Sequence, residues 1–511
     1  MPVSIELNGP SGGGLTLDQI EGWLDQPLRV SVAPQAERLV EQGRRRVEAA
    51  LAAEKPIYGV NTGFGSLCTK RISGEQLEAL QENLVLSHAV GVGPEAPDSL
   101  VRWMLLFKLH VLLSGHSGVR PETVRLMAAM LSADLLPVVP TQGSLGASGD
   151  LAPLAHLVLP MIGRGHLRRS GQRLPAGQAF AEAGLAPTRL QAKEGLALIN
   201  GTQFMSAYAA EAVVRARRLT RQADVIAAMS LDGFAGSVKP FDARLHALRP
   251  HPGALEAAEN VRALMAGSEI LVSHAACDRV QDPYSFRCIP QVHGAVRDAL
   301  RHVSEVTLRE INSVTDNPIL FDRGDVISGG NFHGQPLAIA LDYLAMALAE
   351  LAAISERRIY LLLSGEAGLP ALLMADTGIN SGFMLPQYTA AALVSENKIL
   401  AHPASVDSIP TSLGQEDHVS MGGTAATKCR RVLENAETVL AIELMCAAQA
   451  LDFRAPLQTS AALGAALAEV RKVISHAEAD RLYGDDIRAS LELLRSQKLL
   501  RAVEQAGVRI V

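Results

Sequence analysis

The feature that most constrains the fold is a long apolar stretch between residues 335 and 363. Leucines recur in it at alternating intervals of four and three residues, with alanines between them, which places the leucines along one side of an α-helix. They are Leu337, Leu341, Leu344, Leu348 and Leu351. Because small and branched side chains at these intervals suit close helix packing, the stretch predicts one member of a helix bundle.

The composition extends this prediction to the rest of the chain. Two more long helices are expected at about 387 to 400 and 420 to 450. Hydrophobic residues make up 48% of the 511 residues but aromatic residues only 4%, so the core is built from Ala, Leu, Val and Ile. We therefore expect a mainly α protein, with a long-helix bundle core and a smaller mixed part near the N-terminus.

Charge and cysteine content argue against several kinds of partner. The net charge of −6 gives no general attraction to nucleic acid or to an anionic membrane. The apolar stretch from 337 to 354 is short for a bilayer span and contains Asp342 and Glu350. The 5 cysteines are scattered, without a Cys-x-x-Cys pair, and the start of the chain does not resemble a secretory signal. We expect a cytoplasmic protein with no nucleic-acid or membrane partner.

Metal chemistry is not indicated either. The 14 histidines include no His-Glu-x-x-His pattern, and Glu416, Asp417 and His418 are too contiguous for a typical ligand set. The sequence therefore predicts no metal site.

The stretch that says most about function is a loop of small residues, 143 to 156, which reads Gly-Ser-Leu-Gly-Ala-Ser-Gly-Asp-Leu-Ala-Pro-Leu-Ala-His. Gly149 lacks a Cβ, so its amide nitrogen can approach the Ala147 carbonyl closely and close a five-membered ring. Loss of the Ser148 hydroxyl would then leave a methylidene group conjugated with an imidazolone. The product is an electrophile, which no ordinary side chain is.

Ordinary alternatives compete with this interpretation. A Gly/Ser-rich turn before a helix more often binds an anion or only turns the chain. A nucleophile elbow is excluded because no residue separates Ser148 from Gly149, and a phosphate loop is excluded because no Lys follows the glycines. The tripeptide alone does not decide between the remaining possibilities.

The full run from 143 to 156 resembles the active-site signature of the aromatic amino acid ammonia-lyases. Members of that family build a methylidene-imidazolone (MIO) group from this Ala-Ser-Gly. The resemblance extends from about residue 34 to residue 453 and is greatest to the histidine-specific members. It implies an MIO formed from Ala147, Ser148 and Gly149 without an exogenous cofactor, a small amino acid as substrate, and a homotetramer in which each active site draws on three subunits.

Three N-terminal residues acquire roles from the resemblance. Tyr58 lies in the glycine-punctuated run Tyr-Gly-Val-Asn-Thr-Gly-Phe-Gly; it could be an aromatic plug over the core, but the family motif implies a catalytic acid or base. His88 ends an apolar run where a lone His is more often a hydrogen-bonded core residue; the pair Ser87-His88 instead resembles the substrate-binding pair of histidine-specific members. Asn200 could be only a turn residue before Gly201, but the resemblance makes it an orienting catalytic residue beside the MIO.

The segment from 281 to 290 gathers polar and aromatic side chains between prolines and is poor core material. It matches a family motif in which Gln281 and Arg287 bind the substrate and Tyr284 is catalytic. A guanidinium meets two carboxylate oxygens at once and stays charged, so Arg287 is the expected partner of the substrate carboxylate.

Two later residues complete the expected site. Phe332 matches a substrate-binding position of the family. Glu416, which as an isolated acid would most often be a cap or a surface charge, matches a catalytic position occupied by Glu in histidine-type members. We expect residues 1 to 200 to form an N-terminal part with the MIO loop and the catalytic Tyr loop. Residues 201 to 511 are expected to form the central bundle and the C-terminal helices.

These residues together predict an ammonia-lyase that converts L-histidine into trans-urocanate. The reaction removes a weakly acidic β-proton and expels a poor leaving group. A positioned base gives about 10² to 10⁴-fold, whereas such enzymes need at least about 10⁶-fold, so an electrophile must supply part of the difference. The alternatives are a tyrosine or phenylalanine ammonia-lyase, a 2,3-aminomutase of the same family, and a noncatalytic helical scaffold with an unmodified Ser148.

Overall fold

The computed structural model describes residues 2–23, 26–52, 59, 61–62, 72, 76–275 and 278–511. Tyr58 lies outside the described residues. The chain forms two compact units, and both are discontinuous in sequence. Unit 1 comprises Met1–Val214, Ser304–Asp342 and Pro403–Thr427, and unit 2 comprises Arg215–Val303, Tyr343–His402 and Lys428–Val511. These units are defined by contacts, and each is made of three separate segments of the chain. The expected boundary between residues 200 and 201 stays a prediction.

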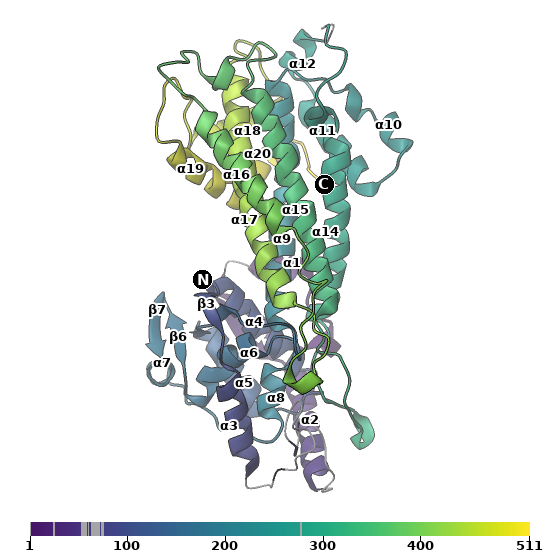
Figure 1. The fold of residues 1–511 in the computed structure, drawn as a ribbon, viewed down its shortest axis with the longest axis vertical. Coiled ribbons are helices and arrows are strands. Elements are labelled where there is room, and N and C mark those ends of the chain that lie inside the picture. The colour runs from purple at the N-terminus through teal and green to yellow at the C-terminus, as the bar shows by residue number, and fades with distance from the viewer. Residues whose placement is uncertain are drawn as a thin grey trace. The chain divides into compact units, whose positions relative to one another are not determined.

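Unit 1 combines short helices with small sheets (Figure 1). Its helices are α1 (Leu17–Trp23), α2 (Pro34–Ala52), α3 (Leu77–His88), α4 (Asp98–Leu112), α5 (Pro121–Ser132), α6 (Leu151–Val158), α7 (Ala176–Glu182) and α8 (Glu194–Ile199). Its strands are β1 (Val3–Leu7), β2 (Leu28–Val32), β3 (Val92–Glu95), β4 (Leu136–Pro137), β5 (Pro140–Gln142), β6 (His166–Arg169), β7 (Gln172–Pro175), β8 (Ile319–Leu320) and β9 (Val326–Ile327). β1 and β2 pair in parallel, whereas β3–β5, β4–β6–β7 and β8–β9 are antiparallel.

Helices α4 and α5 follow each other closely in the chain but are separated by a turn. Glycines between the two helices explain the break: Gly115 and Gly118 both have a positive φ, of 75° and 73°. A Cβ on Gly115 would lie 2.3 Å from the carbonyl oxygen of Leu39 in α2. The chain therefore turns where its backbone passes against α2, and only glycine fits there.

Three short helices of unit 1 bring separate parts of the chain to the loop of residues 143 to 150. Helices α3, α6 and α8 pack against one another. α6 begins directly after the loop, α8 ends directly before Asn200, and α3 ends at His88. Strand β3, shortly after α3, pairs with β5, which leads into the loop. Ends of helices therefore converge on the small-residue stretch.

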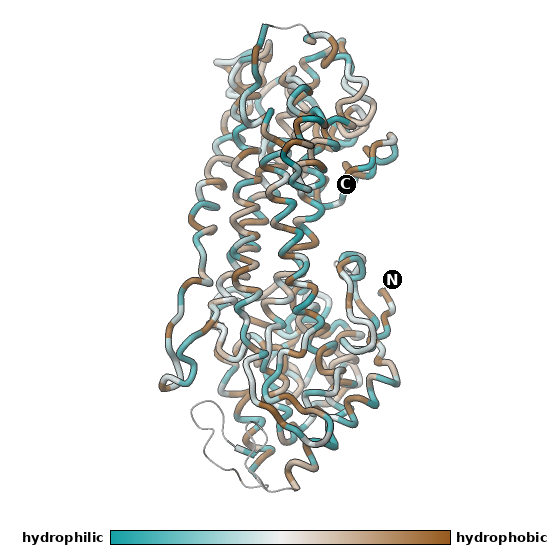
Figure 2. Tube along the Cα trace, turned by 90° about the vertical axis from the view of Figure 1, so that its right-hand side faces the viewer, coloured by the Kyte–Doolittle hydropathy of each residue, from teal (hydrophilic) through white to brown (hydrophobic). Residues whose placement is uncertain are grey.

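Four long helices contribute residues to both units: α9 (Gln203–Gly233), α14 (Ile289–Ile311), α15 (Gln335–Leu362) and α17 (Gly422–Asp452). α15 confirms the leading sequence prediction, since all five of its periodic leucines are fully buried. It is long and apolar enough to span a bilayer by composition, but 67% of its most apolar window is buried inside the protein, as in a core helix. Figure 2 shows hydrophobic and hydrophilic colours alternating along the turns of the long helices. The expected mainly α fold with a helix bundle is confirmed.

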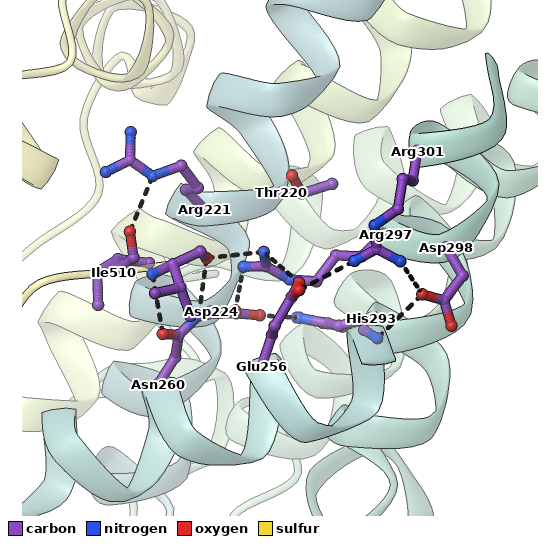
Figure 3. Close-up of polar contacts among 12 residues, drawn as sticks. Thr220, Arg221, Asp224, Glu256, Asn260, His293, Arg297, Asp298, Arg301 and Ile510 are labelled. Carbon is purple, nitrogen blue, oxygen red and sulfur yellow. Dashed lines mark hydrogen bonds and ion pairs between the residues drawn. The ribbon is translucent and has the colours of Figure 1, made fainter. Parts of the chain in front are cut away.

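Unit 2 also contains α10 (Ala243–Ala247), α11 (Pro252–Met265), α12 (Glu269–Ser273), α13 (Tyr284–Arg287), α16 (Met384–Leu400), α18 (Ala461–Arg471), α19 (Tyr483–Arg495) and α20 (Lys498–Gln505). Residues 465 to 505 hold part of α18 and all of α19 and α20. Inside unit 2, Asp224 of α9 accepts hydrogen bonds from His293 (2.7 Å) and Arg297 (2.5 Å) of α14 and from Asn260 (2.8 Å) of α11 (Figure 3). Burial opposes the charge of Asp224, but Arg297 and His293 hold the pKa of its carboxyl below the ordinary value.

Candidate active site

The loop that carries Ala147, Ser148 and Gly149 has an unusual backbone. Ser148 has φ 48°, in the left-handed region that residues with a side chain rarely adopt, and Gly149 has φ 84°. The Gly149 N–H donates a long hydrogen bond, of 3.3 Å, to the carbonyl of Gly146. A strained, tightly turned tripeptide is what closure of a ring across Ala147 and Gly149 requires.

The loop is fixed to the segment that follows α8. Gly149 and Gly201 form a parallel bridge, in which the Gly201 N–H donates to the Ser148 carbonyl at 3.1 Å. The Asp150 N–H in turn donates to the Gly201 carbonyl at 2.8 Å. A Cβ on Gly149 would lie 2.1 Å from the Gly201 oxygen, so the two backbones approach as closely as glycine allows.

The side chain of Asp150 fixes the end of the loop to the start of α9. Its side chain is fully buried, and one carboxyl oxygen accepts the Met205 N–H of α9 at 3.0 Å. Burial raises the pKa of Asp150 to about 7, while hydrogen bonds from the start of α9 oppose the rise. This anchoring role of Asp150 was not predicted from the sequence, because the contact with α9 depends on the fold.

Asn200 lies beside the loop, as expected, and is almost fully buried. Its side-chain nitrogen donates to the Asn317 carbonyl at 2.9 Å. Its side-chain oxygen is buried and has no hydrogen-bond partner among the described residues. An unpaired buried amide oxygen costs free energy, so it is a candidate acceptor for a donor group of the substrate.

A cavity of about 500 Å³ in unit 1 brings several predicted residues together. Ala147, Ser148, Phe332 and Glu416 all line it. One carboxylate oxygen of Glu416 is buried without a hydrogen-bond partner in the described part of the chain. The other lining residues are Gly146, Asn317, Ser328, Gly329, His333, Gln415, His418 and Val419. None of these described lining residues is Lys or Arg, so a cation for a substrate carboxylate must come from outside them.

Two histidines of the cavity wall were not predicted. The rings of His333 and His418 stack, with centroids 5.9 Å apart and 8° between their planes. His333 accepts the Gln335 N–H on Nδ1 at 3.3 Å, so its other nitrogen carries the proton and faces the His418 carbonyl at 3.4 Å. His333 thereby links the start of α15 to the loop that carries Glu416. Their isolated positions in the sequence carry no pattern that would have revealed the pair.

His88 is placed near the loop but not in the cavity wall. It is half-buried at the end of α3, and its Nδ1 lies 3.0 Å from the Ser87 hydroxyl. Burial lowers the pKa of His88, which favours the neutral ring near neutral pH. The described residues that line the 500 Å³ cavity do not include it.

The remaining predicted residues belong to unit 2. Gln281 and Arg287 line a cavity of about 640 Å³ there. The Arg287 guanidinium lies 4.5 Å from the ring centre of Tyr284, whose side chain is 71% exposed. The Arg287 Nε is buried without a hydrogen-bond partner among the described residues. These three residues therefore form one group, and Arg287 retains a donor for a ligand.

Comparison with known proteins decides the family. The family model described as aromatic amino acid lyase matches residues 15–472. The chain belongs to the aromatic amino acid lyase family.

Individual relatives agree with this assignment over nearly the full length. A histidine ammonia-lyase of Sorangium cellulosum is 52% identical over 506 residues, covering 97% of this chain and 98% of the relative. The crystal structure of histidine ammonia-lyase from Trypanosoma cruzi is 41% identical, with a TM-score of 0.90, and covers 99% of this chain and 95% of that chain. Tyrosine aminomutase from Streptomyces globisporus is 36% identical, with a TM-score of 0.92 and complete coverage of both chains.

The loop fits the prosthetic group that the family implies. Ser148 is held in the left-handed region, Gly149 cannot carry a Cβ, and the unpaired Asn200 oxygen lies next to the same peptide segment. A tight turn and a small residue at the nitrogen that closes the ring suit formation of an MIO from Ala147, Ser148 and Gly149. The Asn200 oxygen adds a polar group beside the loop that is suited to orienting a substrate.

Proposed function

We propose that this enzyme eliminates ammonia from L-histidine and releases trans-urocanate. The observation that carries the proposal is that the ring-forming residues Ala147 and Ser148 line the same cavity as Glu416, whose buried carboxylate oxygen is unpaired. An imidazole has one donor and one acceptor nitrogen, so a carboxylate facing its donor nitrogen selects it over a benzene ring. The histidine ammonia-lyases of Sorangium cellulosum and Trypanosoma cruzi support this choice of substrate.

The electrophile would form from the chain itself. The Gly149 nitrogen adds to the Ala147 carbonyl carbon, and the carbonyl oxygen leaves as water with the amide protons of Ser148 and Gly149. The Ser148 hydroxyl leaves with the Cα proton as a second water. The MIO would supply an electrophilic carbon that activates the substrate through its amine or its ring.

The other residues bind, orient and move protons. We assign removal of the β-proton to Tyr58, which lies outside the described residues. Arg287 would hold the substrate carboxylate, because its Nε lacks a partner and the described lining of the unit 1 cavity offers no cation. Asn200 would orient the substrate amine through its unpaired oxygen.

Five residues are assigned to binding and orienting the substrate. Gln281 and Tyr284 would orient the reacting groups, and Tyr284 lies against the Arg287 guanidinium. Phe332 would pack against the substrate from the cavity wall. His88 and Glu416 would contact its ring, with His88 neutral because burial lowers its pKa.

We also propose a homotetramer in which each active site draws on three subunits. An exposed apolar stripe along α15 supports association, since Ile339, Tyr343, Met346 and Tyr360 follow heptad spacing and are each between 42% and 55% exposed. A cytoplasmic location is proposed as well, because the buried Cys446 carries a thiol and forms no disulfide among the described residues, which suits a reducing compartment. Cell fractionation followed by detection of the protein tests the location.

A 2,3-aminomutase is the second candidate, favoured by the tyrosine aminomutase that matches the whole chain with a TM-score of 0.92. Incubation with L-histidine, L-tyrosine and L-phenylalanine, followed by product analysis, separates the candidates. Urocanate from histidine alone is expected. A β-amino acid would make the enzyme a mutase, and coumarate or cinnamate would overturn the roles given to His88 and Glu416.

The variant Ser148→Ala tests the chemistry. The unaltered loop peptide should be lighter than its sequence by roughly 36 Da, the mass of two waters. Ser148→Ala should fold but lack the methylidene, its ultraviolet absorbance and the activity. Full activity of Ser148→Ala would end the proposal, and an unmodified Ser148 in the unaltered protein would favour a noncatalytic scaffold.

A further inference from the structure

Lys108 is a deeply buried cation near the active-site loop, and the proposed mechanism gives it no role. It lies in α4, within the apolar run Leu-Leu-Phe-Lys-Leu, and is 1% exposed. Its ammonium donates to the Ala197 carbonyl at 3.1 Å and to the Asn200 carbonyl at 2.5 Å. Within the described residues it forms no ion pair, whereas the similarly buried Lys193 pairs with Asp316 at 2.8 Å.

Holding this cation inside the protein is costly. Burial lowers the pKa of Lys108 to about 7, while the charge of Asp316 acts in the opposite direction. A hydrophobic residue of similar length would fill the space without that desolvation cost. Because the buried charge is costly, we look for its role in the two carbonyl groups that it binds at the end of α8.

The Asn200 carbonyl that Lys108 binds and the Gly201 N–H belong to the same peptide group. That N–H donates to the Ser148 carbonyl at 3.1 Å. A cation on the oxygen of an amide draws electrons toward it and makes the N–H a stronger donor. The structure thus contains a continuous path: Lys108 ammonium, Asn200–Gly201 peptide, Ser148 carbonyl.

The Ser148 carbonyl oxygen is the one that would be conjugated with the methylidene carbon. A strong donor fixed at this oxygen withdraws electrons from the conjugated system and favours attack at that carbon. The same donor holds the Ser148–Gly149 peptide in the turned geometry of the loop. Both effects act on the chain's own atoms, so both depend on where the Asn200–Gly201 peptide is held.

We infer that Lys108 is a positioning residue that holds and polarises the Asn200–Gly201 peptide, and thereby sets the hydrogen bond on the Ser148 carbonyl that governs ring closure and the reactivity of the resulting electrophile. This inference rests on the proposed function. It differs from a simple cap at the end of α8, which would affect stability without affecting the chemistry of the loop.

The test uses two variants. Lys108→Met keeps an unbranched side chain of similar length and removes the charge, and Lys108→Gln keeps a hydrogen-bond donor on a shorter side chain. His110→Gln is the matched control, because His110 is also buried in α4 and binds Asn312 at 3.0 Å instead of the loop segment. For each full-length protein, three quantities are measured: helicity by circular dichroism, mass of the loop peptide, and the rate at which borohydride removes the ultraviolet absorbance of the electrophile.

Two results would support the inference. In the first, folded Lys108→Met forms the electrophile but reacts with borohydride about tenfold more slowly than the unaltered protein. In the second, folded Lys108→Met keeps the mass of two waters because ring closure fails. Lys108→Gln should fall between Lys108→Met and the unaltered protein. His110→Gln should match the unaltered protein in loop mass and borohydride rate.

Other results would overturn it. Normal loop mass together with an unchanged borohydride rate in Lys108→Met would show that the peptide needs no cation. Failure of both Lys108 variants to fold would assign the residue a purely structural role. Absence of the mass loss from the unaltered protein would instead overturn the proposed function, and the inference with it.

Discussion

Single glycines set the geometry of the active-site loop at the scale of residues. Gly149 combines φ 84° with a backbone contact that leaves no room for a Cβ, since that atom would lie 2.1 Å from the Gly201 oxygen. Gly171, in the turn between β6 and β7, has a similar φ of 78° but nothing within 4 Å of the same position. A substitution at Gly171 would introduce backbone strain alone, whereas a substitution at Gly149 would introduce both strain and a steric clash.

Replacement of Gly149 by Ala is expected to abolish ring closure, because the new methyl group would push the loop away from Gly201. The loop peptide should keep the mass of both waters, and activity should fall by at least about 100-fold. Gly171→Ala should cost about 1–2 kcal/mol of backbone strain and leave the loop mass and activity unchanged. A complete loss of two waters from Gly149→Ala would contradict the prediction. Mass spectrometry of the loop peptide and a urocanate assay make the comparison.

At the scale of elements, a buried histidine ties α4 to the end of α14. His110 is 1% exposed, and its Nε2 lies 3.0 Å from the side-chain oxygen of Asn312, the residue after α14. Asn312 also binds both backbone groups of Leu15, before α1. Burial lowers the pKa of His110 to about 4. Helix α4, the end of α14 and the segment before α1 are therefore linked through Asn312 and His110. The lowered pKa means that the His110 ring is neutral near pH 7.

This contact should make stability depend on pH. An unfolded chain protonates His110 near pH 6.5, whereas the folded protein does so only near its lowered pKa of about 4. The unfolded state therefore binds more protons between these values, and the free energy of unfolding should fall by up to about 3 kcal/mol as the pH falls through that window. Urea titrations at several pH values measure the slope.

Two variants interpret that slope. His110→Gln should flatten it, because Gln can donate to Asn312 without titrating. His166→Gln should leave it unchanged, because His166 is exposed on β6. An equal slope in the unaltered protein and in His110→Gln would show that other groups dominate the acid response.

At the scale of the whole molecule, the exposed stripe of α15 bears on assembly. Met346→Asp would place a charge in this stripe, and we expect a shift in mass by light scattering from a tetramer toward the single chain of 54.2 kDa. Activity should fall with it, since the proposed active sites are shared. Leu482→Asp is the control, because Leu482 is a 78% exposed apolar residue outside the stripe. A single-chain mass for the unaltered, active protein would contradict the proposed tetramer.

The sequence predicted features that depend on local spacing better than features that depend on tertiary contact. The helix from 335 to 363 was predicted almost to its ends, because its leucine spacing records which side is buried. The break between α4 and α5 was not, because Gly115 turns the chain to avoid Leu39, a residue distant in sequence. The possible ring closure of Ala147, Ser148 and Gly149 could be predicted from the sequence, because the reacting atoms belong to neighbouring residues.

The same limit applies to the site. Glu416, Phe332 and the loop were predicted to meet, and they line one cavity. Lys108 and Asn200, which are 92 residues apart, gave no joint signal, since a single Lys in an apolar run does not reveal which carbonyl it binds. The stacked pair His333 and His418 was missed for the same reason. The catalytic and binding roles of the individual residues stay predictions.

The way the loop is held has a consequence for the timing of synthesis. The Leu145 carbonyl accepts the Met421 N–H at 3.0 Å, and Gly146 packs so closely on Ser420 that a Cβ would lie 2.2 Å from its hydroxyl. A ribosome makes the loop long before it makes those partners. Under the proposed chemistry, a growing chain would therefore carry ordinary alanine, serine and glycine until more than four-fifths of it had been translated, and the reactive group would mark a chain that had folded around its own late segment.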